Sequence, residues 1–180
     1  SFDLPVVQAR YEAVLRSDAV HVFTEVKGLL ELKIGATDFK LSARADRIDI
    51  LADGTARIVD FKTGAIPSKP KIEEGFSPQL TLEAAMLERG AFEHVGSLKT
   101  SALTYIRITG GIPPGELKQI DLAPMAVARE HLARLEVALG ERHHVIGEPA
   151  DRLGLGHGRG DPLVPEQRDE QIPEKGPPMS

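Results

Sequence analysis

The sequence predicts an α/β domain with an antiparallel three-stranded meander, a crossover helix and a fourth strand, flanked by helices. Apolar and polar residues alternate with a period of two in three successive segments between residues 21 and 63. Two short turns separate these segments, one at residues 35–38 and one at Asp53-Gly54. Apolar residues recur at helical spacing before and after them, so helices are expected on both sides of the meander in the chain.

The expected elements, in chain order, are a helix (5–15), three strands (21–32, 39–51 and 55–63), a helix (78–89), a fourth strand (103–109) and a last helix (121–139). Ser77 is a favourable N-cap for the second helix, and Pro78 suits the first helical position. Residues 67–71 contain Pro and Lys and are expected to form a loop. Because a helix separates the third and fourth strands, the fourth is reached by a crossover.

Composition narrows the class of protein further. The chain has 180 residues, of which 41% are hydrophobic, enough for one domain with a core. It has no cysteine, which excludes disulfides, thiolate zinc sites and a cysteine-ligated iron–sulfur cluster. No apolar run approaches the about 20 residues that span a bilayer, and the first residues lack a signal-peptide pattern. We therefore expect a soluble cytoplasmic protein without membrane contact.

The chain divides near Gly140 into a domain, residues 1–140, and a tail, residues 141–180. The tail contains six Gly and six Pro without strand or helix periodicity, and we expect it to be disordered. It holds five basic and eight acidic residues, which is most of the net charge of −5. The acidity of the whole chain therefore does not argue against a locally basic site for nucleic acid in the domain.

The candidate site depends on the register of the second and third strands. Five Asp/Glu-x-Lys spacings occur in the chain, so the spacing of Asp60 and Lys62 alone is not specific. If residues 52–54 form a three-residue loop, with Gly54 in the left-handed conformation, Asp46 lies opposite Asp60. Asp46, Asp60 and Lys62 then share one face of the sheet. A two-residue loop would move Asp46 to the face away from Lys62.

Two opposed carboxylates repel each other unless a positive charge lies between them. Mg²⁺ or Mn²⁺ would serve, because both prefer hard oxygen ligands. Lys62 could then stabilise negative charge or orient a water molecule, which makes a hydrolytic site for a phosphodiester. The alternative is an exposed strand end at which Lys62 and Arg44 only neutralise the aspartates.

Three motifs, in this order, carry a resemblance to a known family: Asp46-Arg47-Ile48-Asp49, then Val59-Asp60-Phe61-Lys62-Thr63-Gly64, then Pro78-Gln79-Leu80 at a helix start. Together they resemble the RecB-type nuclease domain of the PD-(D/E)xK superfamily, and within it the C-terminal nuclease domain of AddB-type helicase–nuclease subunits. The resemblance covers residues 21–140. It implies a restriction-endonuclease-like fold.

The resemblance also implies residue roles and an activity. Asp46 and Asp60 would bind Mg²⁺ or Mn²⁺, Lys62 would be the catalytic lysine, and Gln79 would reach back to the site from its helix. The implied activity is exonucleolytic DNA cleavage in double-strand break repair and recombination. The implied partners are DNA and an AddA-like helicase–nuclease subunit.

The chain departs from the family pattern at several places. Residues 1–19 contain no segment like the upstream helix whose His or Glu completes the metal site, and Glu83 stands where relatives often have Tyr. Glu83 and Glu25 are candidate supporting residues; the alternatives are a surface charge and an ordinary strand carboxylate. Lys69 and Lys71 are candidate DNA contacts or plain loop lysines. Many relatives carry a four-cysteine iron–sulfur cluster, which this chain cannot form.

Two further functions stay open at this stage. One is a nuclease-fold module without activity that binds DNA or docks subunits, which the missing upstream ligand favours. The other is a stand-alone nuclease of the same superfamily, such as a CRISPR-adaptation nuclease, although the cysteine cluster usual in that group is absent.

Overall fold

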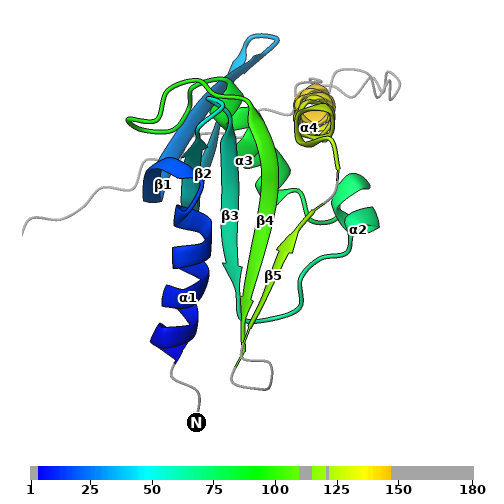
Figure 1. Cartoon of the computed structure of the whole chain (residues 1–180). Coiled ribbons are helices and arrows are strands. Elements are labelled where there is room, and N and C mark those ends of the chain that lie inside the picture. Colours follow the sequence, from blue (N-terminus) through cyan, green and yellow to red (C-terminus); the bar gives the residue numbers. More distant parts are fainter. Residues whose placement is uncertain (1–3, 110–114, 121, 147–180) are drawn as a thin grey trace, which may run out of the picture. The chain divides into compact units, whose positions relative to one another are not determined.

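The computed structural model describes residues 4–109, 115–120 and 122–146, which belong to one compact unit. The elements are α1 (Leu4–Arg16), β1 (Ala19–Ile34), β2 (Thr37–Leu51), β3 (Ala56–Lys62), α2 (Lys69–Glu73), α3 (Gln79–Glu88), β4 (Thr100–Ile108), β5 (Gly115–Gln119) and α4 (Pro124–Ile146). The strands form one sheet in the order β1-β2-β3-β4-β5 (Figure 1). β3 and β4 are parallel, and the other neighbours are antiparallel. The predicted α/β class, with its meander and crossover, is confirmed.

The turn between β2 and β3 has the predicted form, and the predicted register follows from it. Gly54 has a φ of 80°, a left-handed conformation that is easy only for glycine. The Leu51 amide donates to the Thr55 carbonyl at 2.8 Å, which closes the loop. Ile48 then pairs with Ile58, and the ladder ends one pair further on. Continued by one more residue, this register brings the backbone positions of Asp46 and Asp60 opposite each other.

Helices cover both faces of the sheet. In Figure 1, α1 lies in front of the sheet and α3 lies behind it. Tyr11 and Leu15 of α1 pack on Val59 and Ile106, which form a small apolar cluster. The larger core lies on the other face, where α3 and α4 pack on Ile48, Ile58 and Leu103. Because residues alternate along β3, Asp60 and Lys62 belong to the face of the larger core, away from α1.

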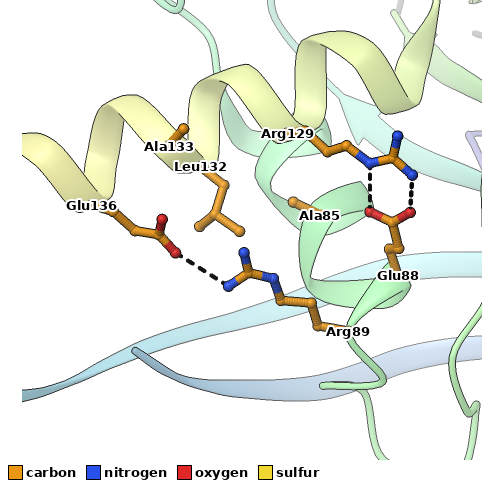
Figure 2. Close-up of a pocket in the computed structure, with 7 residues that line it drawn as sticks. All are labelled: Ala85, Glu88, Arg89, Arg129, Leu132, Ala133 and Glu136. Atoms are coloured by element: carbon orange, nitrogen blue, oxygen red, sulfur yellow. Dashed lines mark hydrogen bonds and ion pairs between the residues drawn. The ribbon is translucent and has the colours of Figure 1, made fainter. Parts of the chain in front are cut away.

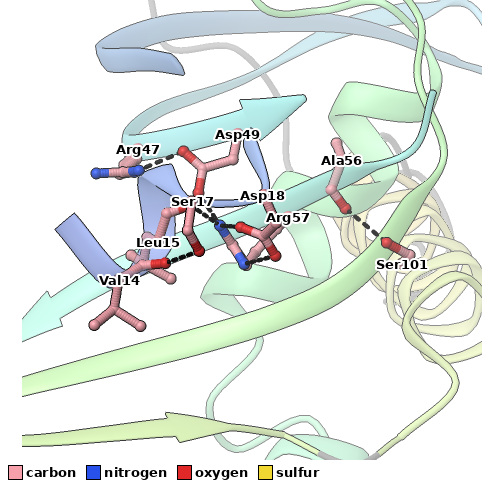
Figure 3. A network of polar contacts seen from close by, with 9 residues as sticks. All are labelled: Val14, Leu15, Ser17, Asp18, Arg47, Asp49, Ala56, Arg57 and Ser101. Carbon is pink, nitrogen blue, oxygen red and sulfur yellow. Dashed lines mark hydrogen bonds and ion pairs between the residues drawn. The ribbon is translucent and has the colours of Figure 1, made fainter. Parts of the chain in front are cut away.

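The α1 face also carries a buried network of opposite charges (Figure 3). Asp49 is fully buried and accepts hydrogen bonds from Arg47 Nε at 2.6 Å and from Arg57 Nη2 at 2.7 Å. Arg57 also donates to Asp18 and to the Leu15 carbonyl. Arg47 is therefore a partner for a neighbouring carboxylate. The network ties the end of α1 to β2 and β3.

Two ion pairs hold α3 against α4 (Figure 2). Arg129 Nε donates to Glu88 Oε2 at 3.0 Å, and Arg89 Nη1 donates to Glu136 Oε1 at 3.2 Å. Leu132 lies between the two pairs and is buried. A third link is the buried His131, whose Nδ1 lies 2.7 Å from Thr81 Oγ1 of α3. α3 is thus attached to α4 along its length, which holds its first turn in place for the site.

Two elements, α2 and β5, were not predicted, and α3 and β4 begin at other residues than predicted. α2 occupies the predicted loop, with Pro70 in its first turn, where the missing amide of proline costs no hydrogen bond. β5 was not predicted, because its five residues have no clear alternation. α3 begins one residue later than predicted: Pro78 is its N-cap, and the Pro78 carbonyl accepts the first helical bond from the Leu82 amide. β4 begins three residues earlier, at Thr100.

The last helix begins and ends later than predicted. α4 starts at Pro124 and continues to Ile146, past the domain limit predicted at Gly140. Gly140 interrupts the apolar pattern of the sequence, but it lies within α4, where it packs closely on Ile34 of β1. The rest of the predicted tail, residues 147–180, lies outside the described residues. None of the described helices is long and apolar enough to cross a membrane.

Candidate active site

The candidate site is centred on Asp60, at the carboxyl end of β3. Its side chain is buried, with the residue 3% exposed. Gln79 Nε2 donates to Asp60 Oδ1 at 2.9 Å. Lys62 Nζ lies 3.0 Å from Asp60 Oδ2 and donates to Gln79 Oε1 at 3.2 Å. Asp60, Lys62 and Gln79, which the sequence placed in one site, therefore contact one another.

Asp46 reaches the same region from β2. Its Oδ2 accepts a hydrogen bond from the Phe61 amide at 3.0 Å, directly beside Asp60 in the chain. The bond holds one oxygen of the Asp46 carboxylate next to β3. The charge of Asp46 also raises the pKa of Asp60 and that of Glu83, so the three carboxylates interact. The structure therefore brings Asp46 to the other predicted site residues.

An irregular step in β1 lies where β1 runs beside Asp46. Phe23 and Val26 both pack on the larger core although they are three residues apart, a spacing that faces opposite sides in a regular strand. Glu25 lies between them with a φ of 55°, a conformation that is rare outside glycine. This left-handed residue changes the phase of the alternation.

Glu25 itself stays at the margin of the site. Its exposed side chain pairs with Arg44 of β2 rather than with Asp46 or Asp60. Arg44 in turn lines the same pocket as Gln79 and Glu83. Glu25 is thus connected to the site through Arg44.

Glu83 lies one helical turn after Gln79, and the two side chains share a face of α3. Gln79 Nε2 donates to Glu83 Oε1 at 3.3 Å, so one amide group contacts both Asp60 and Glu83. Glu83 is 3% exposed, which excludes the surface charge considered from the sequence. Burial raises the pKa of Glu83 to about 8, against an opposing effect of the Gln79 hydrogen bond, and the charges of Asp60 and Asp46 add to the rise.

The pKa of Asp60 is also shifted by burial and by neighbouring charges. Burial raises its pKa above the usual range, while the hydrogen bond and charge of Lys62 lower it. The nearby Asp46 charge raises it again. The net rise means that Lys62 alone does not compensate the buried negative charge.

Tyr105 is a neighbour of the site that the sequence did not point to. It lies opposite Asp60 in the parallel β3–β4 register and is fully buried. Lys62 Nζ lies 5.9 Å from the centre of its ring, within range of a cation–π contact. Burial and the charges of Asp60 and Glu83 raise the pKa of Tyr105 to about 12. Only the pairing of β3 with β4 could have identified it, and that pairing is not local in the sequence.

Lys69 and Lys71 lie on α2, in the connection between β3 and α3. Both are exposed, and Lys69 Nζ lies 3.8 Å from Glu73 Oε1. The Lys71 carbonyl accepts bonds from the amides of Phe76 and Ser77, which fixes α2 to the segment that leads into α3. The two lysines therefore lie in a connection that has Lys62 at one end and Gln79 at the other.

The oxygen atoms of the site fit a hard divalent cation. Glu83 Oε2 is buried and lacks a hydrogen-bond partner among the described residues, and Asp60 Oδ2 is buried with Lys62 Nζ 3.0 Å away. Carboxylate oxygens in a site with surplus negative charge suit Mg²⁺ or Mn²⁺. Within residues 4–109, 115–120 and 122–146, no three His, Cys, Asp or Glu side chains already converge in a coordination shell. The donor set is present, although its members are not drawn together.

Comparison with known proteins agrees with the fold. Residues 5–152 match the family model of the PD-(D/E)XK nuclease superfamily. The chain therefore belongs to the PD-(D/E)XK nuclease superfamily, whose nucleases typically use Mg²⁺.

The chain is also similar to longer proteins from Rickettsia. An uncharacterized protein of Rickettsia typhi is 39% identical over 95 residues, which is 52% of this chain and 11% of that protein. One of Rickettsia bellii is 31% identical over 121 residues, 60% of this chain and 14% of that protein. The chain thus spans a small part of the length of these relatives. The crystal structure of SSO0001 matches 75% of this chain and 58% of its own, with 20% identity and a TM-score of 0.41.

Proposed function

We propose that this domain is a metal-dependent deoxyribonuclease that hydrolyses phosphodiester bonds of DNA. The observation that carries the proposal is the contact of Lys62 and Gln79 with the buried carboxylate of Asp60, three residues brought together from β3 and α3. Membership of the superfamily supports the same activity.

The residues have distinct tasks in this proposal. Asp46 and Asp60 would hold Mg²⁺ or Mn²⁺, and the bound ion would neutralise charge on the phosphate and lower the pKa of a water molecule. Lys62 Nζ carries the positive charge that stabilises the negative charge developing on the phosphoryl oxygens. Gln79 fixes both partners, since its amide contacts Asp60 and Lys62 at once. Hydrolysis forms a bond from the water oxygen to phosphorus and breaks one bond from phosphorus to a deoxyribose oxygen, which leaves with a proton.

The specific role that we propose for this nuclease is exonucleolytic end resection, within an AddB-type subunit of a helicase–nuclease that has an AddA-like partner. Its support is the order of the three motifs and the resemblance of residues 21–140 to that domain. Lys69 and Lys71 would contact DNA phosphates beside the site, as exposed lysines on a connecting segment can. Double-strand break repair is the process that this role would serve.

An inactive module that binds DNA or docks subunits is the second candidate. The observation that favours it is that no three potential ligands already converge among the described residues. The two candidates differ in one outcome, because a scaffold would bind DNA without cutting it.

Incubation of end-labelled linear DNA and closed circular DNA with the chain and Mg²⁺ or Mn²⁺ tests the proposal. We expect cleavage of linear DNA that is abolished in Asp60→Ala and in Lys62→Ala. Preference for linear over circular DNA would support the exonuclease. Unchanged cleavage by both variants would contradict the assigned site, and binding without cleavage by the parent chain would favour the scaffold.

A further inference from the structure

Glu83 is a buried carboxylate whose two oxygens have different surroundings. Oε1 accepts a hydrogen bond from Gln79 Nε2 at 3.3 Å. Oε2 is buried as well, but has no hydrogen-bond partner among the described residues. The side chain therefore enters the site with one oxygen bound and one oxygen free.

A buried carboxylate with a free oxygen is strongly unfavourable unless a cation or a donor compensates it. Asp49, on the other face of the sheet, shows full compensation: it accepts three hydrogen bonds from Arg47 and Arg57. Among the described residues, Glu83 receives one bond, from the Gln79 amide, and its Oε2 has no partner. Glu83 therefore lacks the direct compensation that Lys62, 3.0 Å from Asp60 Oδ2, gives to the adjacent Asp60.

We infer that Glu83 provides, from α3, a third carboxylate ligand of the metal site together with Asp46 and Asp60. This inference rests on the proposed nuclease function and deepens it, because it assigns a ligand that the family motifs do not place at this position. A hard divalent cation is the ligand that a set of carboxylate oxygens recognises.

The position of Glu83 in the fold supports this role. Glu83 lines a pocket of about 240 Å³ between β2 and α3, together with Gln79 and Arg44. α1 packs through Tyr11 and Leu15 on the opposite face of the sheet, so it does not offer a ligand to this site.

A purely structural role would make different demands on residue 83. If Glu83 only positioned Gln79, the contact through Oε1 would be sufficient. Glutamine at this position would then keep the contact, because its amide oxygen can accept the same hydrogen bond. A metal ligand needs the charge and the second oxygen, both of which glutamine lacks. The substitution Glu83→Gln therefore separates the two roles.

The test measures binding of Mn²⁺ to the whole 180-residue chain, by titration calorimetry and by electron paramagnetic resonance of free Mn²⁺. The variants are Asp60→Asn, Glu83→Gln and Glu88→Gln. Glu88 is the matched control, because it lies on the same helix but pairs with Arg129. We expect Asp60→Asn and Glu83→Gln each to weaken Mn²⁺ affinity about tenfold or more. Glu88→Gln should bind like the parent.

The melting temperature gives a second readout that does not depend on activity. Ligands that bind the folded state raise it, so Mn²⁺ should stabilise the parent and Glu88→Gln but not Glu83→Gln. Circular dichroism without metal checks that each variant is folded. If Glu83→Gln does not fold, Glu83→Asp keeps the charge but withdraws the oxygens by one methylene, and it should also bind Mn²⁺ more weakly.

Two results would overturn the inference, and they have different meanings. Mn²⁺ affinity equal to that of the parent in Glu83→Gln, or in Glu83→Asp where the first variant does not fold, would leave Glu83 as a positioning residue if Asp60→Asn still weakens binding. The proposed nuclease would survive that result. A parent chain that binds no Mn²⁺ at all would remove both the inference and the metal-dependent function.

Discussion

The two faces of β2 and β3 both bury carboxylates, but they neutralise them differently. On the α1 face, Asp49 lies between Arg47 and Arg57, and Arg57 is shared with Asp18 (Figure 3). Burial lowers the pKa of Arg57, but its hydrogen bonds to Asp18 and Asp49 outweigh this and hold the pKa above the usual value. Two cations thus meet two anions.

On the α3 face the charges do not balance. Asp46, Asp60 and Glu83 interact with one another, and Lys62 is the cation that contacts Asp60. Burial raises the pKa of Asp60 and of Glu83 despite Lys62. The two faces therefore differ in what their charges do: a neutral network serves stability, whereas surplus negative charge marks the place for a cation.

The largest expected effect separates the two faces by activity. Asp60→Asn should lower DNA cleavage about 10³-fold, because the group that holds the metal loses its charge. Asp49→Asn, the same change on the other face, should leave the activity of the folded fraction nearly unchanged. Cleavage rates of both variants, corrected for folded protein, check this. An equal loss in both would mean that the faces are not functionally distinct.

The same pair should separate in the opposite way by stability. Asp49→Asn leaves two buried arginines short of a counter-charge, and the breaking of such a buried network costs about 3–5 kcal/mol. Asp60→Asn removes a charge whose burial is unfavourable, so the metal-free variant should be at least as stable as the parent. Urea unfolding with chelator present measures both. A large loss of stability in Asp60→Asn would contradict the assignment of surplus charge to that face.

A smaller effect is expected at the border of the site. The double variant of Lys69→Ala and Lys71→Ala should weaken DNA binding. It should also make the slope of log affinity against log salt concentration shallower by about 0.9 for each phosphate that is no longer neutralised. Lys40→Ala is the matched control, because Lys40 is also exposed and also pairs with a glutamate, Glu31. Fluorescence anisotropy at several salt concentrations gives both slopes. Equal slopes in the control and the double variant would remove α2 from the DNA-binding surface.

The smallest effect concerns pH and the paired face. The hydrogen bond from Arg57 lowers the pKa of Asp18, so protonation of Asp18 is more difficult in the folded state than in the unfolded state. This contribution to stability is present above about pH 4 and disappears as the pH falls further. Because Asp18 is largely exposed, we expect about 1 kcal/mol or less. Asp18→Asn should remove this part of the acid sensitivity in melting experiments between about pH 3 and 6. An unchanged pH profile would show that the pair is screened.

The sequence was sufficient where the determining interactions are local. Gly54 adopts the left-handed conformation that the turn needs, and the turn determines which residues of β2 and β3 face each other. The same alternation placed Asp60 and Lys62 on one face, and helical spacing placed Gln79 and Glu83 one turn apart. α2 and β5 were missed, because their patterns are too short to be distinguished from loops.

Tertiary structure decided what those residues do to one another. The burial of Glu83, the position of Tyr105 beside Lys62, and the pairing of Asp49 with Arg57 all depend on elements that are distant in the chain. Electrostatic energies depend on burial and on partners in space, and neither is a property of a sequence window. The sequence by itself therefore determined the fold class and the candidate catalytic residues. The packing of helices on both sides of the sheet made one face neutral and left the other with more carboxylates than cations.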